Sequence, residues 1–506
     1  MASNLPLQVF SSSEIRYIES QYAAGHNGHC YDLMEKAGQA VFAQLLRYVP
    51  APSEVWIFNG RGNNGGDGYI AAACLKMHNI PHRVFALGEP REGSEACTAF
   101  RYYQSMNGKV EFELPSPNDT PPDAIIDALL GTGIESSPRE PASSWILFVN
   151  RCNCFTLAVD VPSGLNADTG EVPGECVSAD VTVCMLGLKP GLLTGEGVDF
   201  AGEVVFEWLG IDAAKFYDHT KAEKLPKLPC RRRGYEDIVD ELPVRVPSSN
   251  KSDSGKVLII AGSAGMGGAA ILCGEGALRS GAGLVKVALD RVNLSALNAV
   301  RPELMSVDID DEDAVEQALD WAEVVAIGPG LGREQRTVRM LGLLNGHPAL
   351  PQVCDADALY FFKDDLLEPS VRRVITPHPG EAARLLECSP EEINRNRLEA
   401  AFELQRLFQG VVLLKGAGTV ICDGKRFTII NEGSAAMATG GMGDVLTGVI
   451  AALIAQGLSV QQAAVCGACL HGRAGQMAGE EGGMIGTLPS DLMPQLRSLV
   501  NGRRFA

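Results

Sequence analysis

Short runs rich in β-branched and aromatic residues alternate with helix-length stretches along most of this chain of 506 residues. Before about residue 210, the strand-like runs cover residues 55–58, 83–87, 124–128, 155–161 and 181–186. After about residue 250, they resume at residues 256–261, 284–289, 324–327, 352–355, 374–376 and 411–415. Strands that alternate with helices form mostly parallel sheets, which need helices on both faces. The pattern predicts an α/β fold made of two three-layer αβα sandwiches.

The length also favours two domains, because single hydrophobic cores stop growing at roughly 250 to 300 residues. Between the two alternating regions, residues 222–254 contain four prolines and the basic triplet Arg231, Arg232 and Arg233. This composition favours a connector, in which the triplet is expected to be solvated rather than bound to nucleic acid. We expect a first domain over residues 1–222, a linker over residues 223–250 and a second domain over residues 251–506.

The charge balance excludes some partners. With 62 acidic and 43 basic residues, the net charge is -19, which opposes binding to nucleic acid or to anionic membranes. The N-terminus does not resemble a secretion signal, and no apolar run reaches the ~18 residues that a membrane span needs. Fourteen cysteines without a regular framework fit a reduced cytoplasm, and Cys466 and Cys469 are expected to pack in a core.

The strongest chemical signal is the sequence Ala-Thr-Gly-Gly-Met-Gly-Asp at residues 438–444, followed by an apolar run at residues 445–455. Glycines allow close backbone approach, and the start of a helix offers unpaired N–H groups to an anion. A carboxylate beside a bound phosphate is repelled unless it has a chemical role, such as taking a proton from an attacking hydroxyl. The motif therefore indicates phosphoryl transfer, with Asp444 as the base.

Other strand ends of the second half carry polar or glycine-rich turns. They are found at residues 328–332, 355–359, 376–381 and 415–419. Lys415 supplies a cation of the kind that borders a nucleotide. The alternatives are that His378 is a rigid loop histidine, that Glu381 is a first-turn charge and that Lys415 only extends its charge to solvent.

Three strand ends of the first half also carry turns with oxygen ligands. Gly60, Gly62 and Gly65 have the spacing of a dinucleotide turn, and Asn63, Asn64 and Asp67 add oxygen atoms to it. Asp127 and Asp160 follow two further strands. The alternative is that the glycines only make turns and that the aspartates cap loops.

The first half resembles the NAD(P)HX epimerases, the N-terminal domain of the NAD(P)H-hydrate repair proteins, over roughly residues 11–208. The matching loops are N-N-G-x-D-G at residues 63–68, D-A-L-L-G-T-G at 127–133 and D-x-P-S-G at 160–164. The resemblance implies a Rossmann-like domain in which Asn64, Asp127 and Ser163 bind K⁺. It also implies that Asp160 acts at the nicotinamide end, and that the hydrate is contacted by Asn63, Asn64, Gly65, Gly66, Asp67, Gly131, Thr132, Gly133, Ile134, Glu135, Ser136, Ser137 and Asp160.

The second half resembles the ribokinase superfamily, and more narrowly the ADP- or ATP-dependent NAD(P)HX dehydratases, over about residues 242–499. The matching motifs are G-P-G-L-G, D-A-D-A-L, T-P-H-P-G-E, K-G-x-x-T and G-G-M-G-D-V-L-T-G. Ala438 is a departure, because relatives commonly carry asparagine there. The resemblance implies that the hydrate is contacted by Ala261, Gly330, His378 and Asp444, and the adenine nucleotide by Lys415, Gly416, Ala417, Gly418, Thr419 and Gly443.

These resemblances imply an enzyme that repairs hydrated NADH and NADPH, called NADHX and NADPHX. The first domain would interconvert the R and S epimers, and the second would dehydrate the S form, with ADP favoured over ATP and with Mg²⁺ expected. We expect a homo-oligomer in the cytoplasm. The alternatives are a ribokinase-like small-molecule kinase fused to a nucleotide-binding domain, and a nucleotide sensor without catalysis.

Overall fold

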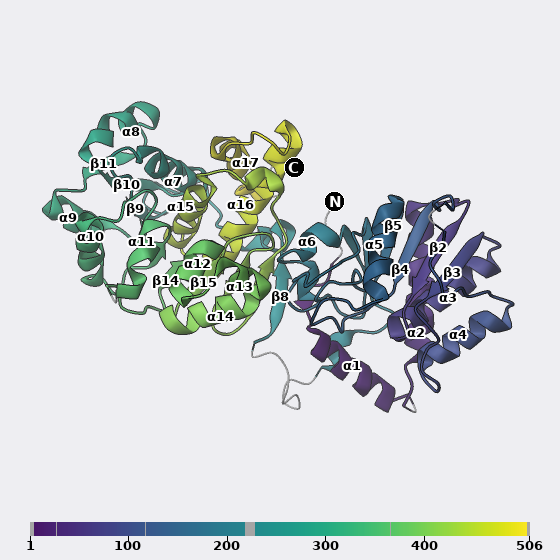
Figure 1. Cartoon of the computed structure of the whole chain (residues 1–506). Helices are drawn as coiled ribbons and strands as arrows, with labels where there is room; N and C mark the ends of the chain where they lie inside the picture. Colours follow the sequence, from purple (N-terminus) through teal and green to yellow (C-terminus); the bar gives the residue numbers. More distant parts are fainter. Residues whose placement is uncertain (1–4, 27, 117, 218–227, 365, 503–506) are drawn as a thin grey trace. The chain divides into compact units, whose positions relative to one another are not determined.

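The computed structural model describes residues 5–26, 28–116, 118–217, 228–364 and 366–502 (Figure 1). The chain divides into two compact units, Met1–Cys230 and Arg231–Ala506. A search of the described helices finds none with the length and apolar character to cross a membrane.

The first unit contains a sheet of six parallel strands in the order β3-β2-β4-β5-β6-β7 (Figure 1). The strands are β2 (Val55–Asn59), β3 (His82–Ala86), β4 (Ala124–Ala128), β5 (Phe155–Val159), β6 (Val181–Met185) and β7 (Glu203–Glu207), and a short β1 (Gln8–Val9) precedes them. The helices are α1 (Ser12–Ala24), α2 (Tyr31–Tyr48), α3 (Asn63–Met77), α4 (Glu95–Ser105), α5 (Ala142–Cys152) and α6 (Gly197–Phe200).

Two hydrophobic clusters cover opposite faces of this sheet. Val55 and Ile57 belong to a cluster that also contains residues of α2, α3 and α4, whereas Trp56 and Phe58 pack with residues of α5. Successive side chains of a strand point to opposite faces, so alternate residues of β2 serve the two clusters. The predicted three-layer arrangement of the first half is confirmed.

The second unit contains a larger sheet, in which strands follow the order β8-β17-β16-β15-β14-β13-β12-β9-β10-β11. The pairs from β15 to β11 are parallel, whereas β16 pairs antiparallel with both β15 and β17. The strands are β8 (Cys230–Arg233), β9 (Lys256–Ile260), β10 (Leu284–Leu289), β11 (Met305–Asp308), β12 (Val324–Ile327), β13 (Gln352–Cys354), β14 (Arg373–Ile375), β15 (Val411–Leu414), β16 (Val420–Cys422) and β17 (Phe427–Ile430).

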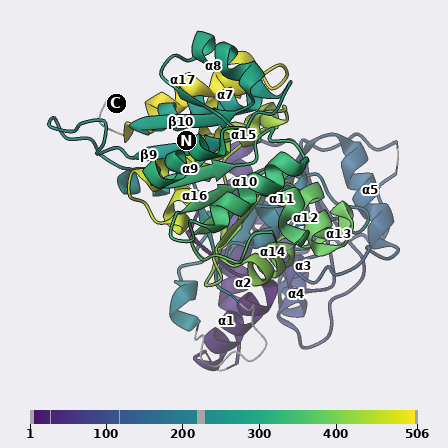
Figure 2. The ribbon, with the colours of Figure 1, turned by 90° about the vertical axis from the view of Figure 1, so that its left-hand side faces the viewer.

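Helices again cover both faces of this sheet (Figures 1 and 2). Val257 and Ile259 of β9 belong to a core cluster with residues of α7 (Gly267–Arg279), α15 (Met442–Ala455), α16 (Val460–Gly482) and α17 (Leu492–Leu499). The remaining helices are α8 (Leu294–Val300), α9 (Glu312–Trp321), α10 (Gln335–Asn345), α11 (Asp357–Tyr360), α12 (Pro379–Leu386), α13 (Pro390–Arg395) and α14 (Arg397–Phe408). The predicted ribokinase-like sandwich is thus present, with its parallel strands ending at one edge.

Part of the predicted linker is ordered structure. β8 lies next to β17 in the sheet, and Ile238 is buried in the core of the second unit. The expectation that the basic triplet is solvated is wrong for Arg232 and Arg233, which are buried and form ion pairs with Asp237 and Glu241. Such pairing allows a charge to be buried. Residues 218–227, where the first domain was expected to end, lie outside the described residues, so that boundary stays a prediction.

The cysteines form no disulfide. All fourteen lie in the described part of the chain, and none is bonded to another cysteine. Cys466 and Cys469 are buried in the core cluster on α16, as the apolar sequence around them predicted.

Candidate active sites

The first candidate site begins at the turn between β2 and α3. An added Cβ at Gly60 would lie 1.8 Å from the carbonyl oxygen of Leu129, so only glycine allows the ends of β2 and β4 to lie this close. Gly65 and Gly66 are buried in the first turn of α3, where an added Cβ would meet Gly60 and Met34. These glycines set how closely α3 approaches the rest of the unit.

The three predicted potassium ligands surround Leu130. The amide nitrogen of Asn64 donates to the carbonyl oxygen of Leu130 at 2.9 Å, and the Ser163 hydroxyl lies 2.8 Å from the Leu130 nitrogen. The Asp127 carboxylate accepts from the backbone nitrogen of Ser163 at 2.8 Å and from its hydroxyl at 2.6 Å. The structure therefore brings together side chains from the start of α3, the end of β4 and the loop after β5.

Asp127 is buried and has no ion-pair partner among the described residues. Burial raises its pKa to about 6, although the hydrogen bonds from Ser163 and Leu129 lower it. A buried carboxylate without a cationic side chain nearby, together with amide and hydroxyl oxygens, fits a monovalent cation. The described residues contain no cluster of three His, Cys, Asp or Glu side chains suited to a metal, so a site here would rest on this mixed set.

A cavity of about 280 Å³ lies beside this turn. The predicted residues Asn63, Asp67 and Asp160 line it. So do three charged residues that the sequence did not single out, namely Glu19 of α1, Glu95 of α4 and Lys189. Burial raises the pKa of Glu19, and burial together with the nearby Asp160 raises the pKa of Asp67 well above its ordinary value.

Asp160 is held in an unusual conformation by local contacts. Its φ is +65°, in the left-handed region, and its backbone nitrogen donates to Val183 at 2.9 Å. Its carboxylate pairs with Lys189, whose side chain is 1% exposed. Burial lowers the pKa of Lys189, but the pairing with Asp160 outweighs it, so this pKa is raised and the ammonium stays charged. Strained residues of this kind concentrate at functional sites.

The predicted loop at residues 131–137 lies apart from this cavity. Gly131 lies against Asn64, where an added Cβ would be 3.4 Å from the Asn64 Cβ, and Ser137 packs against Gly174. None of the seven residues belongs to the cavity lining as far as the described residues show. Their predicted contact with the hydrate stays a prediction.

The second candidate site forms where α15 begins. Gly441 precedes this helix with a φ of +94°, and Asp444 lies in its first turn. Burial and the nearby Asp355 raise the pKa of Asp444 and Lys415 lowers it, with a net value of about 7. A carboxylate that titrates close to neutral pH is suited to general base catalysis.

Asp355 follows β13 and Lys415 follows β15, and their contacts connect these two strand ends to α15. Lys415 Nζ lies 2.7 Å from Asp355 Oδ1, and the Thr447 hydroxyl donates to Asp355 Oδ2 at 2.9 Å. Lys415 also lies 3.9 Å from Glu381. Burial lowers the pKa of Lys415, but Asp355 and Glu381 outweigh it, so the group stays charged. An added Cβ at Gly443 would lie 3.3 Å from Lys415 Nζ, so the glycine loop and the lysine are neighbours.

The other predicted residues of this half take different positions. Gly416 and Gly418 have φ values of +140° and +59°, and the Thr419 hydroxyl donates to the Gly416 carbonyl at 3.1 Å, so residues 415–419 form a tight turn. Arg397, which is buried, donates to the Lys415 carbonyl at 3.1 Å and supports this turn. Ala417 lies within it. Ala261 is fully buried in the core, and its contact with the hydrate stays a prediction.

His378 caps α12. Its Nδ1 accepts from the backbone nitrogens of Gly380 and Glu381 at 3.0 Å and 3.3 Å, and its side chain is 56% exposed. Nδ1 is thus occupied as an acceptor, which leaves Nε2 as the donor in the neutral ring. Glu381 lies in the first turn of α12, as the alternative of a first-turn charge predicted, and its carboxylate accepts from the His378 backbone nitrogen.

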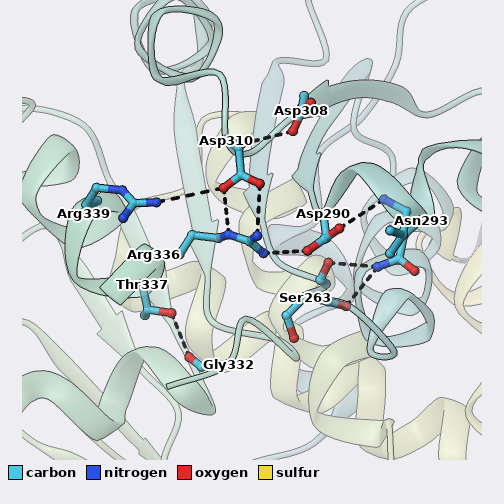
Figure 3. Close-up of polar contacts among 11 residues, drawn as sticks. Ser263, Asp290, Asn293, Asp308, Asp310, Gly332, Arg336, Thr337 and Arg339 are labelled. Atoms are coloured by element: carbon cyan, nitrogen blue, oxygen red, sulfur yellow. Dashed lines mark hydrogen bonds and ion pairs between the residues drawn. The ribbon is translucent and has the colours of Figure 1, made fainter. Parts of the chain in front are cut away.

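A polar network stabilises the loop at the end of β9 (Figure 3). Asn293 donates to the carbonyl oxygens of Gly262 and Ser263, and the Ser263 nitrogen donates to Gly330 at 2.7 Å. Behind it, Arg336 joins Asp290 at 2.7 Å and Asp310 at 2.9 Å (Figure 3). The network fixes Gly330, a predicted contact residue, relative to the ends of β9, β10 and β11.

Comparison with known proteins agrees with this geometry. A family model described as NAD(P)H-hydrate dehydratase matches residues 257–497, and one described as YjeF-related protein N-terminus matches residues 30–191. The bifunctional NAD(P)H-hydrate repair enzyme Nnr of Vibrio cholerae is 39% identical over 98% of this chain and 99% of its own length.

Two solved structures resemble the second unit. A ribokinase-like superfamily protein from Enterococcus faecalis is 28% identical, with 54% of this chain and 95% of that chain covered and a TM-score of 0.50. An ADP/ATP-dependent NAD(P)H-hydrate dehydratase from Bacillus subtilis, co-crystallised with ATP and Mg²⁺, is 28% identical, with 52% of this chain and 95% of that chain covered and a TM-score of 0.47.

Fold and site define a two-unit α/β enzyme whose second unit is ribokinase-like. The chain belongs to the family of bifunctional NAD(P)H-hydrate repair enzymes. Its first unit is the epimerase domain and its second unit is the dehydratase domain. The family assignment excludes the two alternative functions, a small-molecule kinase fused to a nucleotide-binding domain and a nucleotide sensor without catalysis.

Proposed function

We propose that Asp444 is the base that starts the dehydration of S-NADHX and S-NADPHX in the second unit. The observation that carries this proposal is its position in the first turn of α15, beside the Asp355 and Lys415 pair and with a pKa raised by burial to about 7. Near neutral pH, such a group can accept a proton and return it.

The reaction first makes a better leaving group. Hydroxide leaves C6 of the hydrate poorly, so Asp444 removes the hydroxyl proton while the terminal phosphoryl group of ADP or ATP moves to that oxygen. Phosphate then leaves C6 and a proton leaves C5, which restores the dihydropyridine ring. Lys415 lies next to Gly443 and can neutralise phosphate charge during the transfer.

The other residues of this site have binding roles. The turn of Lys415, Gly416, Ala417, Gly418 and Thr419, together with Gly443, contacts the adenine nucleotide. Gly330, His378 and Ala261 contact the hydrate. Mg²⁺ bound with the nucleotide would neutralise phosphate charge during the transfer.

In the first unit, Asp160 acts on the hydrate from the cavity and interconverts the R and S forms. Asn64, Asp127 and Ser163 hold K⁺, which supplies a positive charge next to the buried Asp127. The loop at residues 131–137 contacts the nucleotide part of the hydrate. The chain acts on small molecules as a homo-oligomer.

The test uses purified S-NADHX with ADP and Mg²⁺. The wild type is expected to restore the near-ultraviolet absorbance of NADH and to release AMP and phosphate. The Asp444→Asn variant is expected to be about 10²- to 10⁴-fold slower, the usual contribution of a general base. An unchanged rate in this variant contradicts the proposal.

A further inference from the structure

The cavity of the first unit contains more charge than one catalytic carboxylate requires. Its titratable side chains come from α1, the turn before α2, α3, α4 and the ends of β5 and β6. They are Glu19, Cys30, Asp67, Glu95, Asp160 and Lys189. Among the described lining residues, Lys189 is the single positive charge, and it forms its ion pair with Asp160.

Lys189 is committed to Asp160. Its Nζ contacts Asp160 Oδ1 and donates to the Met185 carbonyl at 2.9 Å, with Cys184 Sγ at 3.8 Å. Asp160 Oδ1 also accepts from the Met185 backbone nitrogen at 3.1 Å. The contacts of Asp160 with Lys189 and with the Met185 nitrogen both use Oδ1, and 20% of the Asp160 side chain is exposed. The geometry fixes one oxygen and orients the carboxylate toward the cavity that it lines.

Asp67 lines the same cavity, but its carboxylate has no ion pair like the one between Asp160 and Lys189 among the described residues. It lies in the second turn of α3, close enough to Asp160 for the two negative charges to interact. Burial and that repulsion raise the pKa of Asp67 well above its ordinary value, whereas the attraction of Lys189 is a smaller effect. Two carboxyl groups in one site, one ion-paired and one favouring its protonated form, are suited to opposite roles in proton transfer.

We propose that Asp67 and Asp160 are the acid and the base of the epimerase, and that Lys189 is the positioning residue that keeps Asp160 as the base. This inference rests on the proposed function of the first unit. It assigns a chemical role to Asp67, which the sequence identified only as a contact residue, and a role to Lys189.

The proton transfers balance without a further reagent. Asp160 takes the proton of the C6 hydroxyl, the carbon–oxygen double bond forms and the C6–N1 bond breaks. Asp67 gives its proton to N1, so the product is a ring-opened aldehyde. Rotation about the C5–C6 bond presents the other face of the aldehyde, and the reverse transfers close the ring as the opposite epimer and restore both side chains.

The experiment follows the full-length chain as it converts pure S-NADHX into the mixture of epimers, without ADP so that the dehydratase stays silent. The Asp67→Asn variant keeps the side-chain shape but has no acidic proton. We expect a kcat about 10²- to 10⁴-fold lower with KM nearly unchanged. The wild-type kcat is expected to fall at alkaline pH as Asp67 loses its proton, and this fall is expected to be absent from the residual activity of the variant.

Lys189 is tested by Lys189→Met, with Lys189→Arg as the conservative variant. We expect Lys189→Met to lower kcat and Lys189→Arg to restore part of it, because the cation beside Asp160 returns. Lys36→Met is the matched control, since Lys36 is 44% exposed on α2, and it is expected to match the wild type. If Lys189→Met does not fold, Lys189→Gln, which keeps a hydrogen-bond donor and removes the charge, takes its place in this comparison.

The outcomes separate the inference from the function on which it rests. If the wild type does not interconvert the epimers, the proposed function of the first unit fails. If the wild type does so and Asp67→Asn has the same kcat and pH profile, the acid–base pair is overturned. Equal activity of Lys189→Met and the wild type overturns the positioning role.

Discussion

Asp444 lies between a negative and a positive neighbour, and this environment controls when it can accept a proton. Burial and Asp355 raise its pKa and Lys415 lowers it, with a result of about 7. We expect the dehydration rate to fall as the pH is lowered through about 7, because protonated Asp444 is no longer a base. The measurement is kcat/KM for S-NADHX from pH 5.5 to 9, where a flat profile contradicts the role.

The raised pKa of Asp444 also makes the free energy of unfolding decrease as the pH rises, whereas an ion-paired carboxylate with a lowered pKa makes it increase. Because the folded-state pKa is raised above the unfolded value of about 3.9, this group's contribution is fully present below about pH 4 and is lost as the pH rises through about 7. Asp444→Asn is thus expected to unfold at higher denaturant concentration than the wild type at pH 8, while catalysis is lost.

Lys415 offers a second prediction for the same carboxylate. Because the Lys415 charge lowers the pKa of Asp444, Lys415→Met is expected to raise that pKa and move the acidic limb of the rate profile to higher pH. Binding of ADP is also expected to weaken. Lys425→Met, which changes an exposed lysine on the turn between β16 and β17, is the control that should leave the profile in place. If Lys415→Met changes neither the acidic limb of the pH–rate profile nor the affinity for ADP, the assignment is contradicted.

Residues that carry a motif were predictable, whereas their partners were not. Asp444, Asp160 and Lys415 stand at strand ends or helix starts beside glycines, which is a local signal. Lys189 also follows a predicted strand, and that signal was overlooked. Glu19 and Glu95 lie in helices without a glycine-rich motif beside them, and only the tertiary fold brings them to the cavity.

At the scale of single elements, the start of α15 depends on a backbone that most residues resist. Gly441 has a φ of +94°, and an added Cβ would lie 2.8 Å from Leu272 and 3.1 Å from Pro489. We expect Gly441→Ala to cost about 1–2 kcal/mol for the left-handed conformation alone and to displace Asp444. Denaturant unfolding and the dehydratase rate measure the two effects.

Gly440 is the matched control for this change. No atom lies within 4 Å of a Cβ added there, so Gly440→Ala should leave stability nearly unchanged. Equal stability of the two variants would show that the loop tolerates a side chain at Gly441, and the account of the α15 entry would then be wrong.

The elements themselves were predicted where the apolar signal was continuous. Predicted runs became β4, β10 and β12 with the same bounds, because strands of a parallel sheet covered on both faces are mostly apolar. β7 was missed because only three apolar residues lie between Glu203 and Glu207, and β11 because it is largely exposed. β8 was predicted to be part of the linker, because three successive arginines indicate an exposed segment. The ion pairs with Asp237 and Glu241 that allow two of them to be buried are visible only in the structure.

At the scale of the whole molecule, one chain joins two activities that need each other. A dehydratase that accepts only the S hydrate leaves the R form behind, and an epimerase on the same chain converts it. The sequence predicted two units, and the structure divides the chain at Cys230 and Arg231.

Potassium provides a prediction that separates the two units. Asp127 is a buried carboxylate without an ion-pair partner among the described residues, so we expect the epimerase to lose activity when K⁺ is replaced by Li⁺, whereas dehydration of pure S-NADHX should not change. Asp127→Asn is expected to remove the dependence on K⁺. Equal K⁺ dependence of both activities would contradict the site.

The most direct test of the central claim starts from an equilibrated mixture of R- and S-NADHX with ADP and Mg²⁺. NADH, AMP and phosphate are measured over time. We predict that both epimers are consumed completely and that the three products form in equal amounts, with formation about 10²- to 10⁴-fold slower in Asp444→Asn. A phosphorylated hydrate that accumulates without NADH, or NADH formation at the wild-type rate in Asp444→Asn, would contradict the account.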